Sequence, residues 1–126
     1  MTLLHACTLL VTLITTEARR QSIPPPLALA VAHVESRCVP AARNPSGAQG
    51  VFQVMPFWTR AFTGRLAQHC GGTDLTDPMV NTCYGVFILR HYAAQCRGNW
   101  ACALRRYSGN HPDYLTLVRA RLREGL

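Results

Sequence analysis

A nearly unbroken apolar run over residues 27–34 constrains the fold more than any other feature of the sequence. His33 is the only polar residue in it, so a helix formed by this run has no polar face to turn toward water. Such a helix is stable only where other elements cover it on all sides. Three prolines at 24–26 end any helix before it and suit the first turn of a new one. The sequence therefore predicts a helix over about residues 26–37 at the centre of a small domain.

Turn and capping signals divide the rest of the chain into further helices. We expect them over about residues 8–21, 56–70, 78–96, 100–107 and 112–123. Asp77 and Asn99 have the side chains that cap a helix start. A turn at 44–47 followed by residues 50–54 predicts a small β-hairpin after the central helix. The expected fold class is mainly α with this hairpin, in one domain over residues 1–126, since a chain of this length supplies a single core.

The charge balance points to an anionic partner. The chain has thirteen arginines, no lysine and six carboxylates, which gives a net charge of +7. Basic residues are spread along the chain without interleaved aromatic residues, which argues against nucleic acid. The apolar stretch over residues 3–14 is too short and too interrupted for a membrane span. The arginines at 119, 121 and 123 fit either a membrane surface or a plain solvated helix face. An acidic polymer remains the best-supported partner.

Six cysteines, an even number, favour disulfides in an oxidising compartment over buried free thiols. They show no metal-ligand spacing, so we expect no metal. The sequence does not fix the pairing, but the segments between Cys70 and Cys83 and between Cys96 and Cys102 are the favoured places for a cross-link. Each encloses a loop that contains glycine or asparagine.

Glu35 is the one carboxylate without an evident structural role. The others are explained by a solvated face beside arginines, by a helix start or by the chain end, at Glu17, Asp74, Asp77, Asp113 and Glu124. Glu35 ends the apolar helix, where burial and the helix dipole favour the protonated acid. A protonated glutamic acid near neutral pH can act as a general acid. The alternative is an ion pair between Glu35 and Arg37 or Arg43.

Two blocks of sequence carry a recognisable motif pattern around and after Glu35. Glu35-Ser36 is followed after eight residues by the block PSGAQGVFQVMP over residues 45–56. Further on stand Asp77-Pro78, Asn81 and Gly85, and then the sequence RYSG over residues 106–109. Together these blocks resemble the soluble lytic transglycosylases, relatives of goose-type lysozyme: the first has the family's spacing, and the later ones match its next helix and its tyrosine motif. The resemblance covers nearly the whole chain and implies a lysozyme-like fold.

The resemblance implies cleavage of the β-1,4 bond between N-acetylmuramic acid and N-acetylglucosamine in peptidoglycan, with formation of a 1,6-anhydro ring. Glu35 would protonate the leaving oxygen and then accept the proton of the muramyl C6 hydroxyl. No cofactor is needed. Ordinary glycosidases need two carboxylates, so the scarcity of acids in this chain agrees with the anhydro route.

The same resemblance implies a set of substrate-binding residues. Gln53 would bind an N-acetyl group, Met55 would line the cleft and Tyr107 would lie near Glu35; plain core packing is the alternative for Met55 and Tyr107. Asn44 stands where the family often has a serine that orients the glutamate, and Ser46 completes the set. Substitutions in the family's motifs occur at Val51, Phe52 and Ser108.

Two other functions remain open at this stage. A goose-type hydrolytic lysozyme would need a second acid, from Asp74 or Asp77, and a non-catalytic module would only bind wall glycan. In each case the expected partner is the peptidoglycan glycan strand, with the protein as a monomer in the periplasm, in the cell wall or outside the cell. The first residues lack the basic region and cleavage site of a signal peptide, so we expect either that a leader has been trimmed or that the protein is delivered by a phage particle or a secretion apparatus.

Overall fold

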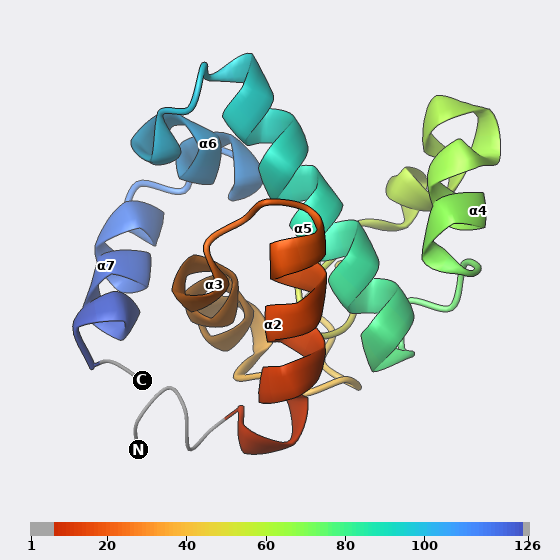
Figure 1. Ribbon diagram of the computed structural model, residues 1–126, viewed down its shortest axis with the longest axis horizontal. Helices are drawn as coiled ribbons and strands as arrows, with labels where there is room; N and C mark the ends of the chain where they lie inside the picture. Colours follow the sequence, from red (N-terminus) through yellow and green to blue (C-terminus); the bar gives the residue numbers. More distant parts are fainter. Residues whose placement is uncertain (1–6, 125–126) are drawn as a thin grey trace.

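Helices make up nearly all the regular structure of residues 7–124, the part of the chain that the computed structural model describes (Figure 1). In chain order they are η1 Thr8–Leu10, α2 Val11–Arg20, α3 Pro25–Ser36, η2 Pro56–Gly64, α4 Arg65–Cys70, α5 Pro78–Gln95, α6 Trp100–Tyr107 and α7 Tyr114–Glu124. Expectations about the first six residues of the chain, including the lack of a signal peptide, lie outside the described residues. No helix in this described part of the chain is both long and apolar enough to cross a membrane.

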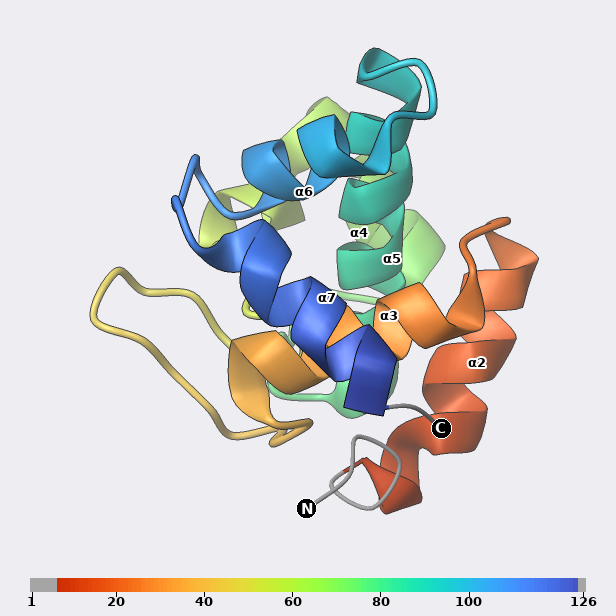
Figure 2. The same cartoon turned by 90° about the vertical axis from the view of Figure 1, so that its left-hand side faces the viewer.

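α3 occupies the centre of the domain, as its sequence predicts. Figure 1 shows it nearly end-on, with α2 on one side and α7 on the other, and both helices contact it. Every residue from Leu27 to His33 is buried, and the alanines at 28, 30 and 32 are completely inaccessible. These small side chains let the neighbouring helices approach closely. Figure 2 shows α7 running across α3, so the C-terminal helix closes one side of the core.

α5 is the second buried helix, and it connects the remaining elements. It contacts α2, α4 and α6, and most residues from Asn81 to Leu89 are buried. Asp77 caps its start by accepting hydrogen bonds from the backbone N–H groups of Met79 and Val80, at 2.9 and 3.1 Å. Asn99 caps α6 in the same way through Cys102 N, at 2.9 Å. Both caps confirm the sequence prediction.

The helix expected over residues 56–70 is interrupted. Phe62 and Thr63 adopt a left-handed backbone (φ +53°) inside η2, which breaks the helix before α4 begins. Threonine and glycine favour the helix weakly here, and Phe62 packs its ring against Phe87 and His91 of α5. This ring packing compensates for the break. The last helix also begins later than expected, at Tyr114, so Asp113 precedes it.

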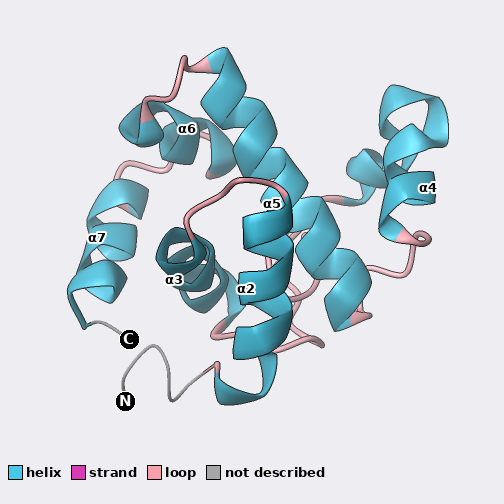
Figure 3. Ribbon diagram, viewed as in Figure 1, coloured by secondary structure: helices cyan, strands magenta, loops and turns pink. Residues whose placement is uncertain are grey.

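The predicted β-hairpin is wrong: the described residues contain no strand, only isolated bridges at Gln49 (Figure 3). Gly50 and Gln53 have positive φ angles, +82° and +50°, which an extended strand cannot accommodate. The buried Asn81 side chain takes the place of a strand partner. It accepts from Phe52 N and donates to Gln49 O, each at 2.8 Å. The backbone groups of this loop are therefore satisfied by a side chain of α5.

Two glycines allow this loop to lie against α5. A Cβ at Gly50 would come within 2.2 Å of Asn81 Nδ2, and a Cβ at Gly85 within 2.2 Å of the Phe52 ring. Any side chain at either position would push the loop away from the helix.

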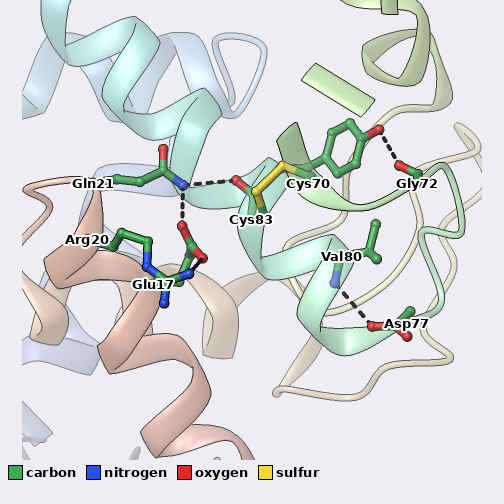
Figure 4. Close-up of a disulfide and its surroundings, with 9 residues drawn as sticks. Glu17, Arg20, Gln21, Cys70, Gly72, Asp77, Val80 and Cys83 are labelled. Atoms are coloured by element: carbon green, nitrogen blue, oxygen red, sulfur yellow. Dashed lines mark hydrogen bonds and ion pairs between the residues drawn. A yellow bond between two sulfur atoms is a disulfide. The ribbon is translucent and has the colours of Figure 1, made fainter. Parts of the chain in front are cut away.

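Three disulfides cross-link the domain. Cys70–Cys83 joins α4 to α5 (Figure 4), Cys96–Cys102 closes the turn between α5 and α6, and Cys7–Cys38 joins the start of the described chain to the segment after α3. The first two confirm the favoured cross-links. No group of metal-ligating side chains occurs within residues 7–124.

Glu17 departs from the sequence-based expectation of a solvated face. Only 12% of its side chain is exposed, and it accepts hydrogen bonds from Gln21 at 2.7 Å and from Arg20 at 3.4 Å. Gln21 also donates to the carbonyl oxygen of Cys83, which ties α2 to α5 (Figure 4).

Candidate functional site

A cleft of about 520 Å³ opens beside the C-terminal turn of α3, and Glu35 lies in its wall. It is lined by Glu35, Asn44, Ser46, Ala48, Gln53, Val54, Met55, Phe57, Trp58, Ile88, Tyr92, Arg106, Tyr107, Ser108, Gly109, His111 and Tyr114. All six candidate residues from the sequence are among them. Glu35 is the only carboxylate among these lining residues.

The turn that presents Glu35 is fixed by its neighbours. Ser36 Oγ donates to the carbonyl oxygen of Val51 at 2.7 Å, which joins the end of α3 to the loop below the cleft. Arg37 then adopts a left-handed conformation (φ +56°), so that the helix ends at Ser36. This end is the usual form of an αL C-cap, here without glycine. The position of the carboxyl group therefore follows from the local structure of α3.

Tyr114 is the hydrogen-bond partner of Glu35. Its hydroxyl donates to Glu35 Oε2 at 2.5 Å, from the first turn of α7. Within the described residues, neither Arg37 nor Arg43 forms an ion pair with Glu35. The ion-pair alternative that the sequence leaves open is therefore not realised.

Burial sets the protonation state of Glu35. It raises the pKa of this carboxyl from 4.5 to about 7, and the Tyr114 hydrogen bond opposes the shift by favouring the charged form. Burial, together with the nearby Glu35 charge, also raises the pKa values of Tyr107 and Tyr114 well above 10. Both phenols therefore keep their protons at neutral pH, and Glu35 is poised to gain or lose one.

Tyr107 has a packing role as well as a place in the cleft. Its hydroxyl donates to Phe52 O at 2.7 Å, and its ring stacks on Tyr114 with centroids 6.3 Å apart. The two tyrosines form one wall beside Glu35. Tyr107 thus combines the expected position near Glu35 with the core packing that was the alternative.

Gln53 is held with its amide group fixed. Its Nε2 donates to Ala42 O at 3.0 Å and to Gly50 O at 2.9 Å. Both amide hydrogens are therefore used within the protein, and Oε1 is the atom left to accept a hydrogen bond in the cleft.

Asn44, Ser46 and Met55 complete the expected set at the edge of the cleft. Asn44 Oδ1 accepts from Ala48 N at 3.0 Å and so closes its own turn. No hydrogen bond of the described chain joins Asn44 to Glu35. The orienting hydrogen bond to Glu35 comes from Tyr114 instead.

The sequence analysis missed Tyr114 and the aromatic side of the cleft. Trp58 and Phe57 come from η2 and Tyr92 from α5. The only sequence signal for Tyr114 is its place at a helix start, four residues before the buried Val118, which puts both on the face that packs inward. Asp74 and Asp77 lie outside the cleft, where they bond to Thr76 and to the start of α5. The Thr76 hydrogen bonds lower the pKa of Asp74.

The family model described as "Transglycosylase SLT domain" matches residues 12–113, which is most of the chain and includes all six candidate site residues but not Tyr114. The chain belongs to this family. Among curated proteins none matches the sequence significantly.

The fold of this SLT domain also occurs among solved structures. The 70 kDa soluble lytic transglycosylase from Escherichia coli superposes with a TM-score of 0.63 at 23% sequence identity. The match covers 90% of this chain and 19% of that protein, so this chain spans about a fifth of its length. At this identity the likeness concerns the fold of the SLT domain.

Proposed function

We propose that this SLT domain is a peptidoglycan lytic transglycosylase that uses Glu35 as its single acid and base. The observation that carries the proposal is the cleft itself, where a buried glutamic acid with a pKa of about 7 lines the wall and no second carboxylate does. A glycosidase that hydrolyses its substrate ordinarily places a second carboxylate across the bond. A route without water needs only one group that can both give and take a proton.

In the first step, protonated Glu35 donates its proton to the oxygen that links N-acetylmuramic acid to N-acetylglucosamine. Since Tyr114 donates to Oε2, the proton is carried by Oε1. The bond between C1 of the muramyl residue and this oxygen breaks, and the N-acetylglucosamine leaves with a free hydroxyl. A pKa near the working pH suits this transfer, because the acid is both populated and strong enough.

In the second step, the Glu35 carboxylate accepts the proton of the muramyl C6 hydroxyl as that oxygen bonds to C1. The product has a 1,6-anhydro ring, Glu35 is protonated again, and no water is consumed. Tyr114 stabilises the carboxylate between the steps by hydrogen bonding, which is stronger to a charged acceptor.

The remaining site residues would hold the glycan. Gln53 Oε1 accepts from the N–H of an acetamido group, and Met55 contributes an apolar surface. Tyr107 fixes the wall beside Glu35, and Asn44 and Ser46 border the entrance. Aromatic rings such as Trp58 suit the apolar faces of sugars. We propose that the chain acts as one catalytic domain and as a monomer, on wall peptidoglycan in the periplasm or outside the cell.

A hydrolytic lysozyme is the less favoured function. Its second acid would have to come from Asp74 or Asp77, and both are engaged elsewhere, as described above. A non-catalytic binding module would not need a buried carboxyl group, because burial disfavours the charged form.

Mass spectrometry of the products from purified sacculi tests the proposal. A transglycosylase leaves anhydromuramyl ends, whereas a hydrolase adds one water at each cut and leaves reducing ends. Reducing ends alone would overturn the anhydro route, and intact sacculi would overturn the enzymatic function.

A further inference from the structure

A row of aromatic rings leads out of the cleft across α5. Trp58 and Tyr92 line the cleft, and the ring of His91 contacts both, at 5.9 and 5.5 Å between centroids. On its other side His91 stacks on Phe87 at 6.0 Å and meets Phe62 edge-on at the same distance. These rings connect the cleft to a neighbouring face of α5.

The row ends in two adjoining hollows that share Phe87 and His69. One, of about 350 Å³, is bounded by the end of α2 and by Arg90 of α5. The other, of about 250 Å³, is bounded by Phe62 and by Arg65 of α4. We call the two together the α4–α5 groove. None of its lining residues belongs to the proposed catalytic site.

The groove is basic and partly apolar. Arg20, Arg65 and Arg90 line it, and no carboxylate does. Arg20 pairs with Glu17, whereas Arg65 and Arg90 form no ion pair within residues 7–124. Phe62 leaves 49% of its surface exposed. Unpaired guanidinium groups beside an exposed ring fit a ligand that carries carboxylates next to an apolar surface.

We propose that the α4–α5 groove is a second binding site for the wall polymer, which takes the carboxylate-bearing peptide stems of a strand whose glycan occupies the cleft. The inference rests on the proposed function, because it extends the same substrate beyond the site of cleavage. The row of rings joins the cleft to the groove, so one strand can reach both. The arginines of the groove complement the negative charge of the stem carboxylates. A strand held at two places dissociates more slowly, since each contact keeps the other at high local concentration.

The direct test is binding of the full chain to purified sacculi by co-sedimentation at near-physiological salt. The variant Arg65→Glu/Arg90→Glu should bind about tenfold more weakly than wild type, a loss of roughly 1.4 kcal/mol. The matched control is Arg119→Glu/Arg123→Glu, which makes the same charge change at exposed positions of α7. The control should lose no more than about threefold. Equal losses of affinity in both variants would show that net charge alone explains the effect, and this result would overturn the proposed site.

A second arm uses the wild-type protein and so does not depend on the folding of a variant. Sacculi whose carboxylates have been converted to neutral amides should bind wild type as weakly as untreated sacculi bind the groove variant. Phe62→Ala, at an exposed ring, should weaken binding by about threefold. Unchanged binding to the amidated sacculi would show that stem carboxylates are not the ligand.

Turnover of a short, peptide-free glycan separates this proposal from the proposed function. Such a glycan fills only the cleft, so the groove variant should process it at the wild-type rate. If wild type cleaves neither this glycan nor sacculi, the proposed function fails, while the binding measurements still report on the groove. If wild type is active and the groove variant binds sacculi as tightly as wild type does, only the groove proposal fails.

Discussion

At the scale of single residues, Glu35 is the group whose removal should stop the reaction. Glu35→Gln keeps the shape of the side chain but cannot give or take a proton. We expect lysis of sacculi to fall by at least about 100-fold, since general acids contribute that much or more. Turbidity of a sacculus suspension measures it. A variant with more than about a tenth of the wild-type rate would contradict the role of Glu35.

The stability of the same variant provides its control. Burial raises the pKa of Glu35 from 4.5 to about 7, so folding is favoured while the group is protonated and is progressively opposed as pH rises through this range. One pH unit is worth about 1.4 kcal/mol, so the free energy of unfolding should fall by up to roughly 3 kcal/mol between pH 4.5 and 7 on account of Glu35. In Glu35→Gln the free energy of unfolding should not fall in this way as the pH rises. Urea unfolding at several pH values measures it, and a destabilised variant at pH 8 would contradict the assignment.

Tyr114 should set the pH at which the proposed reaction is lost. Its hydrogen bond lowers the pKa of Glu35, so Tyr114→Phe should raise that pKa and shift the alkaline limb of kcat/KM to higher pH. The rate itself should fall, by about 10-fold, because Glu35 loses the group that orients it. Tyr107→Phe is the matched control, since that hydroxyl donates to Phe52 O. The expectation fails if both variants shift the alkaline limb equally.

At the scale of elements, the docking of α7 on α3 holds the two parts of the site together. Arg121 Nε donates to Nδ1 of the buried His33 at 2.7 Å, two turns from Tyr114. Arg121→Met should lower the free energy of unfolding by about 1–2 kcal/mol and should slow turnover, because Tyr114 lies on the same helix. Arg119→Met, at an exposed position, is the control. Urea unfolding and hydrogen exchange of α7 measure the effect, and equal exchange in both variants would contradict it.

This contact should also depend on pH. Burial, followed by the charge of Arg121, lowers the pKa of His33 below 6.5, with Arg37 adding to the effect and Glu124 opposing it. The neutral ring is the form that accepts the hydrogen bond, so the stability it provides is present above pH 6.5 and is lost as pH falls through the lowered pKa. The difference between wild type and Arg121→Met should therefore shrink in acid.

Each disulfide should stabilise the domain, and a disulfide that closes a longer loop should stabilise it more. Removing Cys70–Cys83, with a separation of 13 residues, should cost about 3 kcal/mol, and removing Cys96–Cys102, with a separation of 6, about 2 kcal/mol. Serine pairs at each position and thermal unfolding give the comparison. The unreduced, denatured protein should show no free thiol, and six titratable thiols would rule the disulfides out.

Sequence reasoning succeeds here where structure is decided locally. Asp77 and Asn99 cap helices through backbone groups two or three residues away, so the pattern alone identifies them. Glu35 stands out because its own helix is apolar. The β-hairpin prediction fails because the loop bonds to Asn81, about thirty residues further along the chain. Tyr114 is missed for the same reason, since its meeting with Glu35 depends on how α7 packs on α3.

At the scale of the whole molecule, the charge distribution should govern how the protein reaches its substrate. The net charge is +7, and the only ion pairs within residues 7–124 are Arg20–Glu17 and Arg121–Glu124. Most arginines are therefore free to act on an anionic polymer at a distance. Their field extends over roughly a Debye length, about 10 Å at 0.1 M salt. Peptidoglycan carries stem-peptide carboxylates at intervals along each strand, so many such contacts act together.

Raising the salt concentration should then separate binding from chemistry. Between about 0.05 and 0.5 M salt, binding to sacculi should weaken by at least roughly tenfold, because exposed charges are screened. Turnover of a short peptide-free glycan should change by less than about twofold, because Glu35 and Tyr114 are shielded from the solvent by burial. Co-sedimentation and product release, measured in the same buffers, give the two curves. Binding to sacculi that does not change with salt would mean that cleft contacts alone account for affinity and that the arginine excess does not recruit the polymer.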